Sequence, residues 1–187
     1  AAGDYLPLSE LGGDPSRVRQ ELDAWEAFGY VLERHPLRGV AYRSAAERLC
    51  PDEIEYQLGT RWIGARIAVW DRVGSTNDLA ARAAMLSRSN AGLVVLAEEQ
   101  TAGRGRRGRR WCAPPRSSIL MSIVLDPPDP LNTAGFLTAL GAVAVADVVE
   151  QWTHQTARIK WPNDVRVEGK KVAGILVERA GATVLGI

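Results

Sequence analysis

The sequence predicts an α+β fold in which a mixed sheet carries helices packed on one side, preceded by a smaller unit of helices and a hairpin. Two observations lead to this prediction. Beyond residue 66, many strand-like runs alternate with only two helical segments, whereas a doubly wound sheet needs helices between most of its strands. Before residue 45, a helical stretch is followed by two short strands around a turn. We therefore expect units at 1–45 and 66–187, joined by a connector at 46–65.

The overall composition is that of a soluble globular protein, with 46% hydrophobic and 24% charged residues among 187. The formal net charge of +1 provides no general attraction to nucleic acids or membranes, so any affinity for anions must be local. Cys50 and Cys112 fit neither a disulfide framework nor a zinc site. The apolar runs are too short to span a bilayer, and no signal peptide opens the chain. We expect a cytoplasmic protein without a membrane partner.

The first unit is predicted to contain two helices with a tight turn, followed by a hairpin. Asp14 is placed to cap the second helix and Pro15 to occupy its first position, while Gly29 ends it. The apolar stripe of this helix is formed by Val18, Leu22, Trp25 and Phe28. The stretch YVLERHPLRGVAYR then predicts two strands around a turn at 36–39. These elements resemble a partial winged helix-turn-helix without its preceding helix.

A surface for DNA is the functional interpretation of this unit. The second helix is expected to direct four polar or basic side chains outward, of the types that contact phosphates and bases: Ser16, Arg17, Arg19 and Gln20. Such residues are few, however, and a packing domain with a solvated face explains them as well. Both interpretations stay open on the sequence.

The larger unit is predicted to contain six strands and two helices. A short helix beginning near Pro51 leads into it. The strand-like runs are 66–70, 92–97, 117–125, 157–160, 165–167 and 171–178. One helix covers STNDLAARAAMLS and the other about 133–152. The second helix is expected to bury a face formed by Leu137, Leu140, Ala144, Val148 and Trp152.

Five arginines lie within the seven positions from Arg104 to Arg110, spaced by glycines. The glycines match G-x-G-x-x-G, but Pro114 and Pro115 prevent the helix that a dinucleotide-binding turn requires. No G-K-[ST] follows, which excludes a Walker loop, and the flanking strands exclude a disordered arginine–glycine tail. The loop therefore predicts a bidentate grip on a small anion that carries carboxylate or phosphate groups.

Two further segments carry polar groups next to strands. GSTNDLA offers Ser75, Thr76 and Asn77 as donors at the start of a helix, although a plain N-cap explains the segment on its own. KWPND places Lys160 between a strand and a turn, with Pro162 fixing the backbone, although a surface lysine in a hairpin explains it too. Neither segment alone identifies a site.

Taken in order, STND, QTAGRGRRGRRW, KWPND and KKVAGILVE resemble the catalytic domain of biotin protein ligases, over about residues 68–187. The resemblance implies a catalytic domain with a class II aminoacyl-tRNA synthetase-like fold. Members of this family join biotin to ATP, with Mg²⁺, to form biotinyl-5′-AMP, and transfer biotin to a lysine of a biotin carboxyl carrier protein. The winged-helix-like unit resembles bifunctional members that also repress biotin synthesis genes, so operator DNA and a second copy of the chain are further candidate partners.

The same resemblance implies roles for individual residues. The expected biotin-binding set is Ser75, Thr76, Asn77, Gln100, Gly103, Arg104, Gly105, Arg106, Lys160, Gly174, Ile175 and Leu176. The expected set for the adenylate and its phosphate is Arg104, Arg106, Arg107, Trp111 and Asn163. Lys160 and Arg106 are the expected catalytic cations, because two anions must meet during adenylation. Asp164 is a candidate for holding a metal ion near the phosphates.

Compared with the family, the chain is expected to be incomplete at both ends, which leaves its own activity open. A glycine-rich strand with adenine-contacting residues and a small C-terminal barrel would follow in the family. Two alternative functions also remain. A lipoate or octanoate ligase-like enzyme shares the fold, and a DNA-binding biotin sensor would bind the vitamin without ligase activity.

Overall fold

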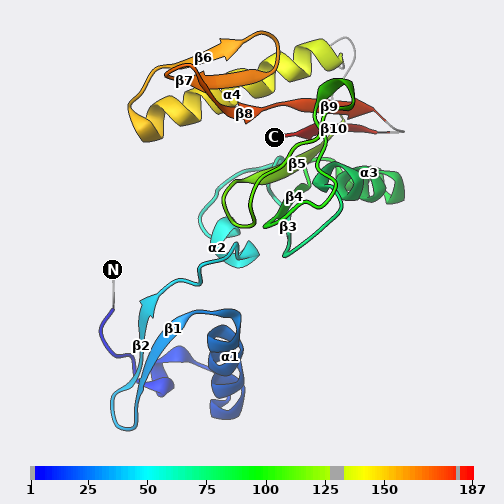
Figure 1. The fold of residues 1–187 in the computed structure, drawn as a ribbon. Helices are drawn as coiled ribbons and strands as arrows, with labels where there is room; N and C mark the ends of the chain where they lie inside the picture. Colours follow the sequence, from blue (N-terminus) through cyan, green and yellow to red (C-terminus); the bar gives the residue numbers. More distant parts are fainter. Residues whose placement is uncertain (1–2, 127–132, 180–181) are drawn as a thin grey trace. The chain divides into compact units, whose positions relative to one another are not determined.

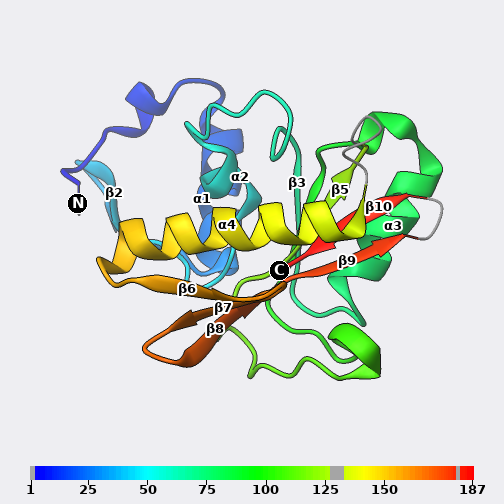
Figure 2. The ribbon, with the colours of Figure 1, turned by 90° about the horizontal axis from the view of Figure 1, so that it is seen from above.

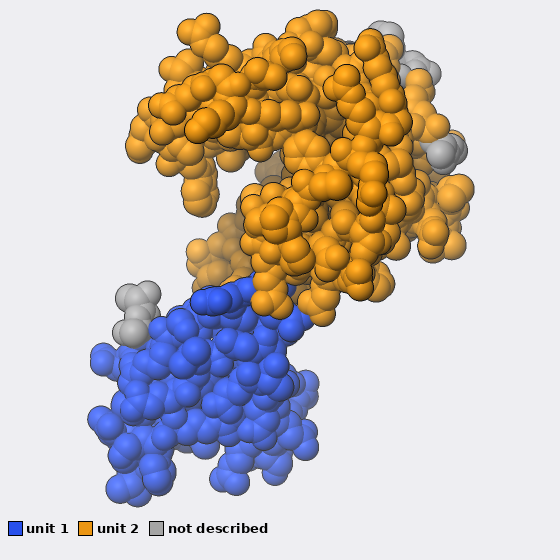
Figure 3. Space-filling model, viewed as in Figure 1, with its two compact units in different colours: residues 1–50 blue, residues 51–187 orange. Residues whose placement is uncertain are grey.

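The computed structural model describes residues 3–126, 133–179 and 182–187. The chain divides into two compact units, Ala1–Cys50 and Pro51–Ile187, which are coloured separately in Figure 3. The division falls inside the predicted connector, whose first residues belong to the first unit and whose later residues belong to the second.

From residue 3 onward, the first unit contains one α-helix, one short 3-10 helix and one hairpin (Figure 1). Helix α1 (Pro15–Phe28) is capped by the Asp14 carboxylate, which accepts hydrogen bonds from the backbone N–H groups of Ser16 at 3.0 Å and Arg17 at 3.1 Å. Gly29 ends the helix with a φ of 119°, which confirms the predicted caps. The helix predicted before α1 is instead the single 3-10 turn η1 (Leu8–Leu11). Its continuation is prevented by Gly12 and Gly13, both at positive φ.

The hairpin pairs β1 (Val31–His35) with β2 (Gly39–Ser44) in antiparallel fashion, as predicted. Gly39 has a φ of 94°, and a Cβ at this position would lie 1.9 Å from the carbonyl oxygen of Leu6, so only glycine fits. The four side chains proposed to face DNA on α1 are all exposed: Ser16, Arg17, Arg19 and Gln20. A winged-helix role for this unit stays a prediction.

The second unit is built on two sheets (Figures 1 and 2). The larger sheet has the order β3-β4-β5-β10-β9, with the bounds Ile67–Trp70, Val94–Ala97, Leu120–Leu125, Thr183–Gly186 and Leu176–Arg179. Only β3 and β4 run parallel, so this is the mixed sheet that the sequence predicts. The smaller antiparallel sheet has the order β6-β7-β8, with the bounds Ala157–Lys160, Asp164–Val167 and Lys170–Gly174.

One predicted strand is wrong and another strand was not predicted. The run 171–178 is not continuous: it covers all of β8 but its first residue and most of β9, which belong to different sheets. The chain changes sheet at Ile175, which is almost fully buried and whose N–H donates to the carbonyl oxygen of Asn163 at 2.9 Å. Strand β10 was absent from the prediction, yet it lies inside the larger sheet between β5 and β9.

Two helices pack on the larger sheet. Besides the short helices α2 (Pro51–Glu55), η2 (Arg88–Asn90) and η3 (Arg106–Gly108), the unit contains α3 (Thr76–Leu86) and α4 (Ala134–Thr153). Ala80 of α3 forms a buried cluster with Val95, Val124 and Val184. Leu185, the next residue of β10, contacts Gly141 of α4. Since successive residues of a strand point to opposite faces, α3 and α4 lie on opposite faces of β10, whereas the sequence predicts helices on one side.

The buried face of α4 differs from the predicted one. Of the predicted stripe, Leu137 is buried, whereas Leu140, Ala144, Val148 and Trp152 are exposed, Trp152 to 84%. The buried residues are instead Leu137, Thr138, Gly141, Ala142 and Ala146. Small residues face the sheet because the approach is close: a Cβ on Gly141 would lie 3.0 Å from Leu185 Cδ1. By length and composition alone α4 could cross a membrane, a property that core helices of soluble proteins share.

Candidate active site

A cavity of about 310 Å³ lies in the second unit, where the first turn of α3, the arginine loop, the turn between β6 and β7, and the segment from β8 to β9 meet. Most residues that the sequence predicts for the site line this cavity: Ser75, Thr76, Asn77, Gln100, Arg104, Gly105, Arg106, Arg107, Trp111, Lys160, Asn163, Asp164, Gly174, Ile175 and Leu176. Gly103 is buried beside it, where a Cβ would lie 2.6 Å from the carbonyl oxygen of Trp111.

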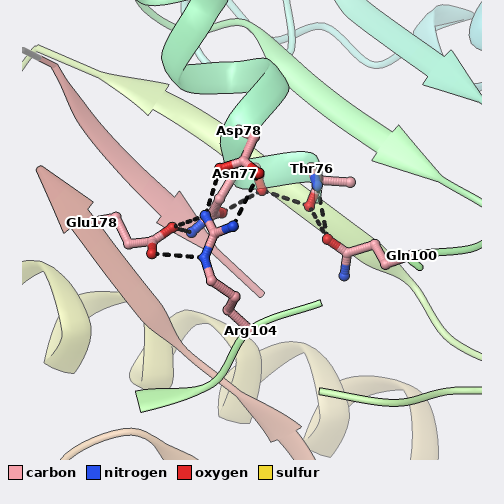
Figure 4. Close-up of polar contacts among 7 residues, drawn as sticks. Thr76, Asn77, Asp78, Gln100, Arg104 and Glu178 are labelled. Carbon is pink, nitrogen blue, oxygen red and sulfur yellow. Dashed lines mark hydrogen bonds and ion pairs between the residues drawn. The ribbon is translucent and has the colours of Figure 1, made fainter. Parts of the chain in front are cut away.

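The start of α3 is held by Gln100 rather than by its own N-cap (Figure 4). Ser75 occupies the N-cap position and is buried, but its side chain makes no capping hydrogen bond. The Gln100 Oε1 atom accepts from the Thr76 backbone N–H at 2.7 Å and lies 3.1 Å from the Thr76 hydroxyl. The Ser75 hydroxyl is therefore available to a ligand at the positive end of a helix.

The Asn77 side chain is held at both ends of its amide. Its Oδ1 atom lies 2.5 Å from the hydroxyl of Ser122, which is fully buried on β5 and lies 2.8 Å from Thr76 Oγ1. Its Nδ2 atom donates to Glu178 Oε2 at 2.7 Å. A primary amide has two N–H donors, so one donor of Asn77 remains for a ligand in the cavity.

The Arg104 guanidinium is bound by two carboxylates (Figure 4). It donates to both oxygens of Asp78 at 2.7 and 3.0 Å, and to both oxygens of Glu178 at 2.8 and 3.1 Å. These hydrogen bonds lower the pKa of each carboxyl group below its ordinary value and raise the pKa of Arg104. This geometry does not match the phosphate-binding role that the sequence predicts for Arg104, because its N–H donors already face protein carboxylates.

A second network links the arginine loop to the KWPND segment. Arg106 donates to Asn163 Oδ1 at 2.9 Å, and Asn163 Nδ2 donates to Asp164 Oδ1 at 3.0 Å. The same Asp164 oxygen accepts from Lys171 Nζ at 2.7 Å, and this ammonium lies 5.1 Å from the ring centroid of Trp111. The Arg104 network thus joins the loop to α3 and β9, and the Arg106 network joins it to the turn between β6 and β7.

The carboxylate of Asp164, the candidate metal ligand, has a protein partner. Its carboxylate is paired with Lys171. Over residues 3–126, 133–179 and 182–187, no group of three or more His, Cys, Asp or Glu side chains is placed to hold a metal ion. In this structure the Asp164 carboxylate positions the Lys171 ammonium, and a metal role for Asp164 stays a prediction.

Lys160 ends β6 and projects to the cavity as an exposed side chain. Within the described part of the chain, neither Lys160 nor the outer loop residues Arg107, Arg109 and Arg110 pair with an acidic side chain. Lys160 adjoins the cis peptide bond between Trp161 and Pro162. The cavity therefore combines fixed polar groups around Asn77 with unpaired positive charge near Lys160.

Several site residues were missed from the sequence. Met121, Lys171, Gly186 and Ile187 line the cavity, and Ser122 and Glu178 hold Asn77. The signal for Ser122 was a single hydroxyl inside the apolar run ILMSIVL. Glu178 lies within the segment KKVAGILVE, where nothing local indicates its contact with Asn77.

The cavity can accept a molecule that has a hydrogen-bonding head, an apolar body and an anionic end. Asn77 and Ser75 provide polar groups, and Ile175, Leu176 and Met121 contribute apolar walls. Lys160 and the outer arginines line the same cavity and supply the positive charge that the joining of an acid to a phosphate requires. These features are those of an acid-activating ligase.

Comparison with known proteins places the chain in a family. Residues 69–186 match the family described as Biotin/lipoate A/B protein ligase family, and the chain belongs to this family. It is 34% identical over 185 residues to the bifunctional ligase/repressor BirA of Bacillus subtilis, covering 95% of this chain and 56% of that protein. It is 41% identical over 152 residues to the biotin–[acetyl-CoA-carboxylase] ligase of Mycobacterium tuberculosis, covering 75% and 57%.

A solved structure of the biotin protein ligase from Aquifex aeolicus in complex with biotin and ATP has a similar fold. The TM-score is 0.56 at 29% identity, over 65% of this chain and 50% of that chain. The biotin acetyl coenzyme A carboxylase synthetase from Helicobacter pylori, with bound biotinylated ATP, gives a TM-score of 0.54 at 26% identity, over 65% and 58%. This chain spans about half the length of the relatives that it matches.

Proposed function

We propose that the chain carries the acid-activating site of an ATP-dependent biotin protein ligase. The enzyme would form biotinyl-5′-AMP and then transfer biotin to a lysine of a biotin carboxyl carrier protein. The observation that carries the proposal is that one cavity is lined both by the fixed polar groups around Asn77 and by the cationic side chains of Lys160 and the outer arginines. Biotin has matching groups, with a ureido head, an apolar ring and tail, and a terminal carboxylate.

The Asn77 amide and the Ser75 hydroxyl would bind the ureido group. Ser122 and Glu178 set the orientation of the amide. The Asn77 Nδ2 donor and the Asn77 Oδ1 acceptor therefore have fixed positions before a ligand binds. The apolar part of biotin would contact Ile175 and Leu176. Such preorganisation lowers the entropic cost of binding.

Attack of the biotin carboxylate on the α-phosphate of ATP brings two anions together. Lys160 and Arg106 would neutralise this charge as it shifts, and Arg107 would contact the remaining phosphates. Arg106 is already oriented by Asn163. Mg²⁺ would enter with ATP as part of the substrate, so the chain need not supply a metal site.

The test is to mix the chain with biotin and MgATP and to measure pyrophosphate release together with biotinyl-AMP by mass spectrometry. Formation of pyrophosphate and biotinyl-AMP supports the proposal. A chain that binds biotin tightly but forms neither product supports the biotin sensor instead. Calorimetric titration with lipoate beside biotin tests the lipoate ligase alternative. Tighter binding of lipoate would contradict the biotin assignment.

A second function, DNA binding by the first unit, is proposed on one further observation. Ser16, Arg17, Arg19 and Gln20 are exposed together on α1. The similarity to a protein named as a bifunctional ligase/repressor extends over 95% of the chain and so includes this unit. The partner would be duplex DNA, bound chiefly through its phosphates.

A further inference from the structure

Arg104 joins three segments that are distant in the sequence. Asp78 lies 26 residues before it on α3, and Glu178 lies 74 residues after it on β9. Both carboxylates bind the guanidinium with two oxygens each, the geometry in which arginine pairs are strongest. We call Asp78, Arg104 and Glu178 the ion triad.

The ion triad is only partly buried, which argues against a role in stability alone. The exposed fractions of its side chains are 47% for Asp78, 38% for Arg104 and 34% for Glu178. Solvent screens such pairs, and exposed pairs contribute about 0–1 kcal/mol to folding. What the triad supplies is geometry, because it fixes three elements around one planar group.

The ion triad shares an atom with the ligand-facing network. Glu178 Oε2 accepts from Arg104 at 2.8 Å and also from Asn77 Nδ2 at 2.7 Å. An ionised carboxylate only accepts hydrogen bonds, so Glu178 can pair only with the Nδ2 atom of the Asn77 amide. The Ser122 hydroxyl lies on the other side, beside Asn77 Oδ1. Glu178 and Ser122 therefore prevent the Asn77 amide from turning over.

Arg104 also stands at the base of the arginine loop. Its backbone pairs with that of Arg110, Gly105 N–H donates to Arg109 O at 2.7 Å, and Trp111 N–H donates to Gly103 O at 2.9 Å. The loop is thus a closed hairpin with its base at Arg104. Beyond the base the loop has contacts of its own, since Arg109 N–H donates to Arg106 O at 3.3 Å and Arg106 donates to Asn163 Oδ1 at 2.9 Å, so the Arg104 side chain fixes the base and not the direction of Arg106.

We propose that Arg104 and Glu178 are positioning residues and that Arg104 does not bind phosphate. Arg104 holds the base of the loop on α3 and β9, and Glu178 holds the Asn77 amide in its binding orientation. This inference rests on the proposed function, because the ligand that Asn77 meets is taken to be biotin. The cations that bind the phosphate are then those beyond the base of the loop, Arg106 and Arg107.

The experiment compares affinities for two probes, biotin and a non-hydrolysable sulfamoyl analogue of biotinyl-AMP, by calorimetric titration. Arg104→Ala is expected to weaken both probes by the same factor, because it disturbs the site that both share. Arg106→Ala is expected to weaken the analogue by a further factor of about 10 to 150, the range for a lost charge-assisted contact. A loss for Arg104→Ala that is at least about tenfold larger for the analogue than for biotin would overturn the proposal.

The matched control is Arg72→Ala, which removes an exposed arginine paired with Glu99 outside the cavity lining. It should leave both affinities at the wild-type values. The role of Glu178 at Asn77 is tested in the Arg104→Ala background, where the pairing of Glu178 with Arg104 is already lost, by adding Asn77→Ala, Glu178→Ala or both. If Glu178 acts through Asn77, adding both weakens biotin binding no more than adding Asn77→Ala alone, whereas additive losses contradict this role.

A readout in the free protein separates this inference from the proposed function. The side-chain amide resonances of Asn77 should shift in Glu178→Gln and Arg104→Ala and stay unchanged in Arg72→Ala. Unchanged resonances in all three variants would overturn the positioning role. A wild-type chain that binds no biotin would refute the proposed function, and the amide resonances would still decide whether the triad orients Asn77.

Discussion

Lys160 is the residue whose loss we expect to reduce catalysis most. It lies at the end of β6 beside Pro162 and has no acidic partner in the described residues, so its charge is available to a transition state. Lys160→Ala should lower the rates of adenylate formation and of biotin transfer by about 10²–10³ and change biotin affinity far less. Lys160→Arg should restore only part of the rate, because a planar fork differs from a compact ammonium. Pre-steady-state measurement of both steps in a full-length parent checks this, and adenylation at the wild-type rate in the alanine variant would contradict it.

Gly186 provides a second prediction at the scale of one residue. A Cβ at this position would lie 2.4 Å from Asn77 Oδ1, so Gly186→Ala must displace the amide from Ser122 and Glu178. Loss of a buried hydrogen-bonding arrangement costs about 1–3 kcal/mol, and biotin affinity should fall by roughly 5- to 150-fold. The control is Gly135→Ala on α4, where a Cβ meets no atom within 4 Å. Equal biotin affinity in the Gly186 variant and the wild type would show that the amide tolerates the methyl group.

The sequence could identify residues whose role is visible in a short motif, and it missed those whose role depends on a distant partner. Ser75, Thr76, Asn77 and Lys160 were predicted from local segments, and all line the cavity. Glu178 holds a side chain 101 residues away and could not be assigned from its neighbours. For the same reason the sequence predicts a phosphate ligand at Arg104, since no local pattern shows a carboxylate 74 residues away.

At the scale of elements, the attachment of the arginine loop to α3 and β9 should depend on pH, because the ion triad provides it. Arg104 lowers the pKa of Asp78 and of Glu178, and Arg82 also lowers that of Asp78. Because the pKa values of both carboxyl groups are lower in the folded protein than in the unfolded chain, the ion pairs of the triad are fully formed above the ordinary values near 4. They are lost as the pH falls through the lowered values. Biotin affinity should therefore stay constant between about pH 8 and 5 and fall below about pH 4.

The matched variant for this prediction is Asp78→Asn with Glu178→Gln, which should bind biotin weakly at neutral pH and lose little more on acidification. Titrations over this pH range, with circular dichroism confirming that the fold persists, provide the measurement. An equal acid-induced loss in the variant and the wild type would show that other groups control binding.

Elements were predictable where the local pattern and the packing agree. The strand 157–160 was predicted with the bounds that β6 has, and the caps of α1 were predicted from Asp14, Pro15 and Gly29. The buried face of α4 could not be predicted in this way. Hydrophobicity favours burial of Leu140 and Trp152, whereas close packing on Leu185 requires Gly141 on the buried face. Side-chain size, set by a partner strand distant in the sequence, decided which face is buried.

At the scale of the whole molecule, the two units should carry separable functions. Replacing Arg17 and Arg19 with alanine in a full-length parent should weaken DNA binding and reduce the slope of log K against log salt by about one per lost phosphate contact. Adenylation should be unchanged, since these side chains belong to the first unit. Binding assays at several salt concentrations, with an adenylation assay as control, check both outcomes. A parent that binds no DNA at any salt would leave the first unit as a packing domain.

The place of β10 inside the larger sheet has a consequence for the order of events during synthesis. This strand follows β5 and β9 in the chain but lies between them, and its Gly186 contacts Asn77 in the lining of the cavity. A nascent chain that has exposed everything up to Arg179 therefore still has two unpaired strand edges, which are sites for wrong pairing. The ligand pocket closes only when the residues of β10 have left the ribosome, so a ligand that stabilises the folded unit can act only after that point.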